Sequence, residues 1–212
     1  MKWITHIFFL LLLYILCSSK SCSDDRTSGS RFEKGRIEAA RDSVRHVFGT
    51  DTLSTSRLKA FEHTAEQKLV DFADYLKIAS DTSVNALFRK QGAEMAGHLF
   101  IPGKVIISNW SQTDATPTRV TLQDLLEKCI SVGMRTWVQP GTITILIPFI
   151  RENDSAYKGR LVFYGHNVSY SEPFQKQNAS KRLSVDIYAI RKVKSFGTEN
   201  LRVWEVYLGD IN

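Results

Sequence analysis

Hydrophobic residues in the first half of the chain recur at intervals of three and four, the spacing of one face of an α-helix. The longest such run predicts a helix that begins near Ser54–Ser56 and is built on Leu58, Phe61, Ala65, Leu69, Phe72 and Leu76. An earlier helix is expected to begin at the capping box of Ser30 and Glu33 and to end at Gly49. A third helix is expected to be capped by Asp81 and to have one apolar side, made of Val84, Leu87, Phe88, Gln91 and Met95.

The second half of the chain changes to strand periodicity, in which apolar and polar residues alternate. Strands are predicted over residues 142–149, 160–165, 182–190 and 202–208, with a hairpin connection at Lys194–Asn200. Pro148 has no N–H to donate, so the first of these strands is expected at a sheet edge or bulged at that residue. Gln139–Gly141 is a turn signal between strands.

Two short segments lie between these halves. Lys104–Asn109 is interpreted either as an early strand or as an extended segment. Thr121 and Asp124 have the spacing of a capping box, so a short helix is expected from there through Cys129–Ile130. Cys129 falls on the apolar face of that helix, so we expect it to pack as a small hydrophobic residue rather than to act as a nucleophile.

Helices first and strands second predict an α+β domain, in which N-terminal amphipathic helices pack on a curved antiparallel sheet formed by the C-terminal half. Short connections between consecutive strands favour the antiparallel pairing. This order of elements over residues 32–209 resembles the nuclear-transport-factor-2-like fold. The resemblance implies a cone-like sheet, but it selects no function, because that superfamily includes enzymes, binding modules and assembly subunits.

The N-terminus has the layout of an export signal. Met1–Trp3 carries one lysine, and an apolar run follows at Ile7–Leu16. The length of this run suits a secretory signal and falls short of the roughly 20 residues that span a bilayer. We therefore expect residues 1–21 to be a signal peptide, with a short uncleaved anchor as the alternative.

Cys22 follows the apolar run closely, after the small residue Ser21 and before Ser23–Asp25. This arrangement resembles the processing site of bacterial lipoproteins and the acidic tag of surface lipoproteins in the Bacteroidetes group. The resemblance implies a lipid on Cys22 and a location at the membrane of the cell envelope, periplasmic or at the cell surface. Residues 22–31 then form a flexible tether, and residues 32–212 a single domain. The alternative is an ordinary signal peptide with two incidental cysteines, Cys17 and Cys22.

Length, cysteine content and charge narrow the class of protein and the kinds of partner that we expect. A length of 212 residues favours one domain, and three cysteines are too few for a disulfide-stapled mini-protein. The net charge is +6, and removal of residues 1–21 takes away two lysines and no acidic residue, which leaves +4. The basic residues are scattered and form no nucleic-acid motif, so we expect no specific nucleic-acid partner. The oligomeric state stays open.

The sequence contains no phosphate-binding loop, no nucleophile elbow and no zinc-ligand spacing, so we expect no cofactor and no metal. One constellation is a candidate catalytic site. Asp186 and Tyr188 share the less apolar face of their strand, and Tyr164 and His166 would join them if that face lined the mouth of a cone-shaped sheet. A carboxylate in such a pocket would serve as a base. The alternative is a solvated outer face with cross-strand pairs.

Three functions are compatible with these features. The export signal, Cys22 and the lack of catalytic motifs favour a membrane-tethered lipoprotein whose non-catalytic domain binds a ligand or an envelope protein. Trp110 lies in a polar stretch and is a candidate exposed anchor for such a partner. The first alternative is a small cavity enzyme, a hydrolase or isomerase, with Asp186 or His166 as base. The second is an accessory subunit of a secretion or conjugation apparatus.

Overall fold

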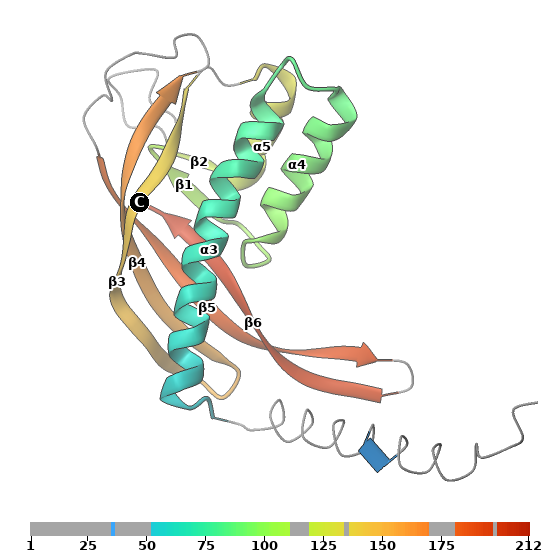
Figure 1. The fold of residues 1–212 in the computed structure, drawn as a ribbon, viewed down its shortest axis with the longest axis vertical. Helices are drawn as coiled ribbons and strands as arrows, with labels where there is room; N and C mark the ends of the chain where they lie inside the picture. The colour runs from blue at the N-terminus through green and yellow to red at the C-terminus, as the bar shows by residue number, and fades with distance from the viewer. Residues whose placement is uncertain (1–34, 37–51, 111–118, 134–135, 170–180, 197–198) are drawn as a thin grey trace, which may run out of the picture. The chain divides into compact units, whose positions relative to one another are not determined.

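A computed structural model describes residues 35–36, 52–110, 119–133, 136–169, 181–196 and 199–212 (Figure 1). The chain divides into two compact units, Met1–Val47 and Phe48–Asn212, and every element below belongs to the second. The predicted signal peptide, Cys22 and the tether lie outside the described residues. So does the helix expected over residues 30–49, apart from Gly35 and Arg36, which are helical.

The long helix predicted after Ser54 is confirmed as α3, Thr55–Ser80. Ser54 caps it, because its Oγ accepts a hydrogen bond from the backbone N–H of Arg57 at 3.4 Å. The helix buries the apolar face that the periodicity predicts, and its buried residues include Ala65, Leu69, Phe72 and Leu76.

The third predicted helix is observed as α4, Ala86–His98, but its cap and its buried face differ from the prediction. Asn85, not Asp81, is the cap, and its side chain accepts from the N–H of Leu87 at 2.8 Å. The expected apolar side is exposed, and the residues buried instead are Gly92, Ala93 and Ala96. A Cβ added at Gly92 would lie 3.1 Å from the Ile78 side chain, so α4 approaches α3 closely through small residues and turns its large ones outward.

The short helix is α5, Leu122–Ser131, and Thr121 is its N-cap as the predicted capping box requires. Thr121 Oγ1 accepts from the Asp124 N–H at 3.1 Å and donates to Asp124 Oδ2 at 2.6 Å. The helix ends at Ser131, and just beyond it Gly133 has a φ of +79° and donates its N–H to the Cys129 carbonyl at 3.1 Å.

The strands of the described residues form an open sheet in the order β2-β1-β6-β5-β4-β3. The four long strands pair antiparallel as predicted, whereas β1 joins β6 in parallel at Ile107 and Ile211. The α+β class therefore holds, with a mixed sheet rather than a wholly antiparallel one. The strand bounds are β1 Ile106–Ser108, β2 Arg119–Thr121, β3 Thr136–Asn153, β4 Ala156–Ser169, β5 Lys181–Phe196 and β6 Glu199–Ile211.

The edge strand β3 shows how proline is accommodated in this sheet. The prediction for Pro148 is confirmed, since β3 lies at an edge and its register with β4 shifts between Ile147 and Ile150. The turn predicted at Gln139–Gly141 is wrong, because those residues continue β3. A second register shift follows Pro140, and proline is tolerated there because an edge strand has unpaired positions.

The core lies between the helices and one face of the sheet (Figure 1). The Phe72 ring of α3 lies 4.7 Å from the Trp110 ring, which lies 5.9 Å from the Phe163 ring of β4. α3 also reaches both flanks of the long strands. Glu62 Oε1 accepts from the Phe149 N–H of β3 at 3.1 Å, and Lys68 Nζ lies 5.6 Å from the Tyr207 ring of β6.

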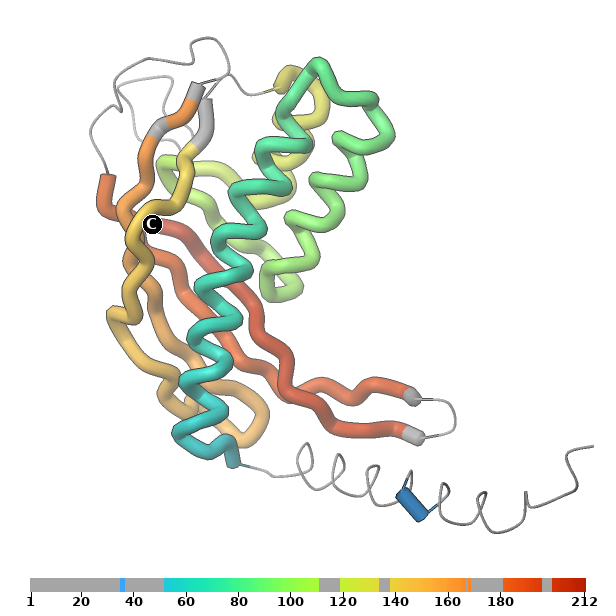
Figure 2. The backbone as a smooth tube through the Cα atoms, in the orientation of Figure 1, coloured from blue at the N-terminus to red at the C-terminus, as the bar shows by residue number. Residues whose placement is uncertain are grey.

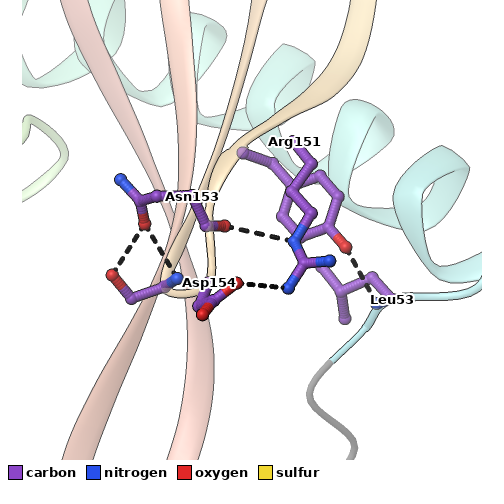
Figure 3. Close-up of polar contacts among 6 residues, drawn as sticks. Leu53, Arg151, Asn153 and Asp154 are labelled. Carbon is purple, nitrogen blue, oxygen red and sulfur yellow. Dashed lines mark hydrogen bonds and ion pairs between the residues drawn. The ribbon is translucent and has the colours of Figure 1, made fainter.

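Figure 3 shows the turn between β3 and β4, which is held by its own side chains. Arg151 Nη2 lies 2.6 Å from Asp154 Oδ1, and Asn153 Oδ1 accepts from the N–H and hydroxyl of Ser155, each at 2.8 Å. Just after the turn, the Tyr157 hydroxyl accepts from the Leu53 N–H at 3.2 Å. This bond fixes the chain entering α3 against the end of the hairpin.

Candidate functional site

Asp186 lies on the face of the sheet that points away from the helices. Along β5, Val185 and Ile187 are buried in the core, so strand alternation places Asp186 on the other face. It is nevertheless 7% exposed, because two cations cover it. Arg160 Nε lies 2.7 Å from Oδ1, and Lys158 Nζ lies 3.1 Å from Oδ2. These residues therefore form the cross-strand pairs that were the alternative to a catalytic pocket.

Tyr188 belongs to the same cluster. Lys158 Nζ lies 5.2 Å from its ring centroid, and hydrogen bonding to Tyr188 and to Asp186 raises the pKa of Lys158. The ring lies against Gly209, where an added Cβ would be 2.5 Å from a ring carbon. The Tyr188 ring fits there because Gly209 has no side chain.

Tyr164 and His166 do not join this cluster. Arg160 is opposite Asp186, whereas Tyr164 is further along β4 and opposite Arg182. His166 is further still, beside Gln139 of β3. Since a strand rises about 3.3 Å per residue, Tyr164 is roughly 13 Å from the position of Arg160. The structure thus brings Asp186 and Tyr188 together and leaves the other two candidates apart.

A hollow of about 300 Å³ adjoins Asp186 on this face. Two exposed isoleucines, Ile147 and Ile150, form its apolar side. Its charged residues are Arg151, Lys158 and Arg160 against Glu152 and Asp186, and Arg151 is itself paired with Asp154. Positive and negative charges nearly cancel, so the hollow has no strong preference for an ion of either sign.

The prediction that Trp110 is an exposed anchor is wrong. Trp110 is 1% exposed and packs against Phe72 and Phe163, which come from distant parts of the sequence. The polar residues on either side of it in sequence reflect its loop position, and its own ring belongs to the core.

A different surface has the properties of a binding site. A groove of about 650 Å³ lies between α4, α5 and the segment that leads into β1. Its apolar floor is made of Ala93, Val105, Leu122, Leu126 and Ile130. Its rim carries both signs of charge and one amide: Lys90, Glu94, Lys104, Gln123 and Glu127. An apolar hollow with a few polar groups at its border is typical of ligand and peptide sites.

Four large apolar side chains of α3 and α4 are exposed. Leu87 is 72% exposed, Phe88 61% and Met95 42%, and the neighbouring Ile78 of α3 is 40% exposed. Leu87 lies seven residues before the rim residue Glu94, hence on the same side of the helix. Phe88 and Met95 lie on the side of α4 away from the groove residues, so only Leu87 extends the apolar surface of the groove.

Arg89 joins the helices that build the groove. Its Nε donates to the Ala79 carbonyl near the end of α3 at 3.1 Å. Its Nη2 donates to the Cys129 and Ile130 carbonyls near the end of α5 at 2.8 and 2.7 Å. Carbonyls at helix C-termini carry partial negative charge, so a guanidinium is favourable there. One side chain of α4 thereby positions α3 and α5.

Cys129 packs beneath the groove, which confirms the expectation that it is part of the core. It is fully buried, and desolvation by burial raises the pKa of its thiol to about 12. A thiol in that state supplies little thiolate at neutral pH, which disfavours a nucleophilic role.

Among the described residues, no group of three or more histidine, cysteine, aspartate or glutamate residues is placed to hold a metal ion. Nor does any helix there combine the length and the apolar character needed to cross a membrane. No protein-family model matches the sequence, and no curated protein matches it either.

Proposed function

We propose that this protein is an exported lipoprotein, anchored through Cys22 in the cell envelope, whose domain binds a partner protein and performs no catalysis. The observation that carries the binding role is the apolar groove between α4 and α5, with the exposed Leu87 on the same side of α4. The anchoring role rests on the N-terminal pattern of an apolar run, Ser21, Cys22 and an acidic tag.

The chemistry of the groove favours an amphipathic helix of the partner as its occupant. Its floor offers aliphatic contacts from two helices, which suits apolar side chains at intervals of three and four. Lysine and glutamate occur together on the rim, at Lys90 and Glu94 of α4, so a helix with mixed charges beside its apolar stripe would find a complement. A strongly charged ligand would meet repulsion from one of the two signs.

The two alternatives receive different support. A cavity enzyme is less favoured by the geometry, because Asp186 is held between two cations and lies apart from Tyr164 and His166. An accessory subunit of a secretion or conjugation apparatus would use the same groove, so it is one form of the proposed partner binding. A curved sheet resembling the nuclear-transport-factor-2-like fold remains part of the proposal, supported by the contacts of α3 with both β3 and β6.

The two halves of the proposal have separate tests. The mass of the mature N-terminal peptide tests anchoring, because a lipoprotein would begin at an acylated Cys22. A photo-crosslinking residue at Gln123 on the groove rim tests binding in the native host, with the exposed Thr144 on the opposite face of the sheet as control. We expect a product heavier than the 24.1 kDa chain from position 123 and none from position 144. Equal yields from both positions would contradict groove binding.

A further inference from the structure

Along most of its length, the outer edge of β6 has no strand beside it among the residues that the structure describes. β1 is only three residues long and meets β6 at Ile211, and the segment before it meets β6 at Leu208. Within the described residues, no strand pairs with the outer edge of β6 between Asn200 and Val206. Figure 2 shows this part of the β5–β6 hairpin extending away from the helices.

The hydrogen bonds of Leu208 show which backbone groups point outward. Its N–H donates to the Leu99 carbonyl at 2.9 Å, and its carbonyl accepts from the Ile101 N–H at 2.8 Å. In an antiparallel pair, alternate residues direct both backbone groups to the same side. The β5–β6 register is unbroken from Leu208 to Glu199, so the same orientation recurs at Val206, Trp204, Arg202 and Asn200.

The edge strand β3 and the unpaired part of β6 differ in sequence. β3 carries Pro140 and Pro148 and shifts register with β4 four times, features that prevent edge-to-edge pairing. β6 contains no proline, and it pairs with β5 without a shift over Glu199–Leu208. An unprotected edge of this length is a template for another strand.

We propose that two copies of this chain associate through this edge, with β6 antiparallel to β6 about a two-fold axis at Val203. This register places Arg202 opposite Trp204 of the second copy, and Asn200 opposite Val206. All the outward backbone groups of these four residues then have partners. The pairing joins the two sheets into one continuous sheet.

The neighbouring registers are less favourable. Centring the axis on Arg202 sets two arginines opposite each other, and like charges in directly opposed positions are destabilising. Centring it on Trp204 sets Asn200 opposite Leu208, whose backbone groups already bond Leu99 and Ile101. Centring on Val203 avoids both problems.

Site-directed disulfide formation tests this register. The full chain would carry Cys17→Ser and Cys22→Ser, which leaves Cys129, a buried thiol, as its native cysteine. Val203 would face its own copy in a non-hydrogen-bonded pair, where Cα atoms are about 4.5 Å apart and a disulfide can form. We expect Val203→Cys to give a disulfide-linked dimer under mild oxidation. Ser195→Cys, exposed on β5 of the same hairpin, should stay monomeric.

A second variant separates pairing from folding. Arg202→Pro removes an N–H that points to the open edge, so pairing with β5 is kept and the circular dichroism spectrum should not change. It should abolish the Val203→Cys dimer, whereas Arg202→Ala, which keeps the N–H, should retain most of it. A monomeric mass for the unmodified chain with no crosslink at position 203 would overturn the proposal. So would equal crosslinking at positions 203 and 195, or an Arg202→Pro variant that still dimerises.

Discussion

Replacement of Arg89 by methionine tests whether one side chain holds the three helices in place. The variant keeps an apolar stem of similar reach and removes the guanidinium, which bonds one carbonyl near the end of α3 and two near the end of α5. Water can reach some of the released carbonyls, because Arg89 is only half-buried. In the variant, these carbonyls therefore exchange hydrogen bonds with a charged group for hydrogen bonds with water, and they are not all left without a partner.

The expected loss in the free energy of unfolding is estimated by counting the two helix ends as two anchoring points. A hydrogen bond to a charged group contributes about 1.5–3 kcal/mol net. The two acceptors on α5 share one Nη2, so they count as one point. We expect Arg89→Met to lower the free energy of unfolding by about 3 kcal/mol, and Arg89→Lys by about 2 kcal/mol because an ammonium cannot reproduce the planar fork.

Urea unfolding followed by circular dichroism measures this directly, with Lys90→Met as the matched control. Lys90 is the next residue of the same helix and is exposed, so its substitution should change the free energy of unfolding by less than about 0.5 kcal/mol. Equal stability of Arg89→Met and Lys90→Met would refute the anchoring role. An Arg89→Lys variant as stable as the unmodified chain would show that charge alone matters, without the fork geometry.

Three further predictions concern the core and the outer face of the sheet. Trp110→Ala should lower the free energy of unfolding by about 3–5 kcal/mol, measured by the same urea series, and a change below about 1 kcal/mol would contradict its burial. Gly209→Ala should lower it by about 1–3 kcal/mol because the new methyl group meets the Tyr188 ring, and the loss should shrink when Tyr188→Ala is present. Burial raises the pKa of the Cys129 thiol from 9.0 to about 12, so unfolded chains lose this proton first as the pH rises. Stability should therefore fall between about pH 9 and pH 12, and a Cys129→Ala variant that shows the same fall would show that other groups cause it.

The fold was predictable where local pattern and burial agree. In α3 the apolar spacing of Leu69, Phe72 and Leu76 is itself the buried stripe, because a long helix lying on a sheet buries one continuous face. In α4 the spacing of the large apolar residues was visible, but those residues are exposed and the small residues are buried instead. Gly92 and Ala96 allow α3 and α4 to approach closely, and nothing local to the sequence distinguishes that close contact from a face packed through large residues.

Trp110 and Asp186 show that the surroundings of a single residue are likewise not predictable from its neighbours in sequence. The neighbours of Trp110 in sequence are polar, whereas the rings that bury it belong to α3 and β4. Alternation placed Asp186 on the less apolar face of its strand, but its cations depend on the β4–β5 register, which brings Arg160 opposite it. Registers and helix contacts between distant segments are set by the whole fold.

Only one wall of the groove could be predicted from the sequence. The pattern predicted a short amphipathic helix through Cys129–Ile130, and α5 has an apolar face. Leu125 and Cys129 on that face are buried, whereas Leu126 and Ile130 line the groove. Only the placement of α4 by Arg89 and the small residues at 92, 93 and 96 decides which part of the face stays open.

Photo-crosslinking from Gln123 in the native host, with and without a charge in the groove floor, tests the proposed partner binding most directly. Leu126→Glu places a carboxylate among the apolar groove residues at a half-buried position, and Ile150→Glu makes the same change on the opposite face of the sheet. The proposal predicts that the crosslinked product persists in Ile150→Glu and falls at least tenfold in Leu126→Glu, the change that about 1.4 kcal/mol of lost binding energy gives. An unchanged yield in a folded Leu126→Glu variant would contradict it.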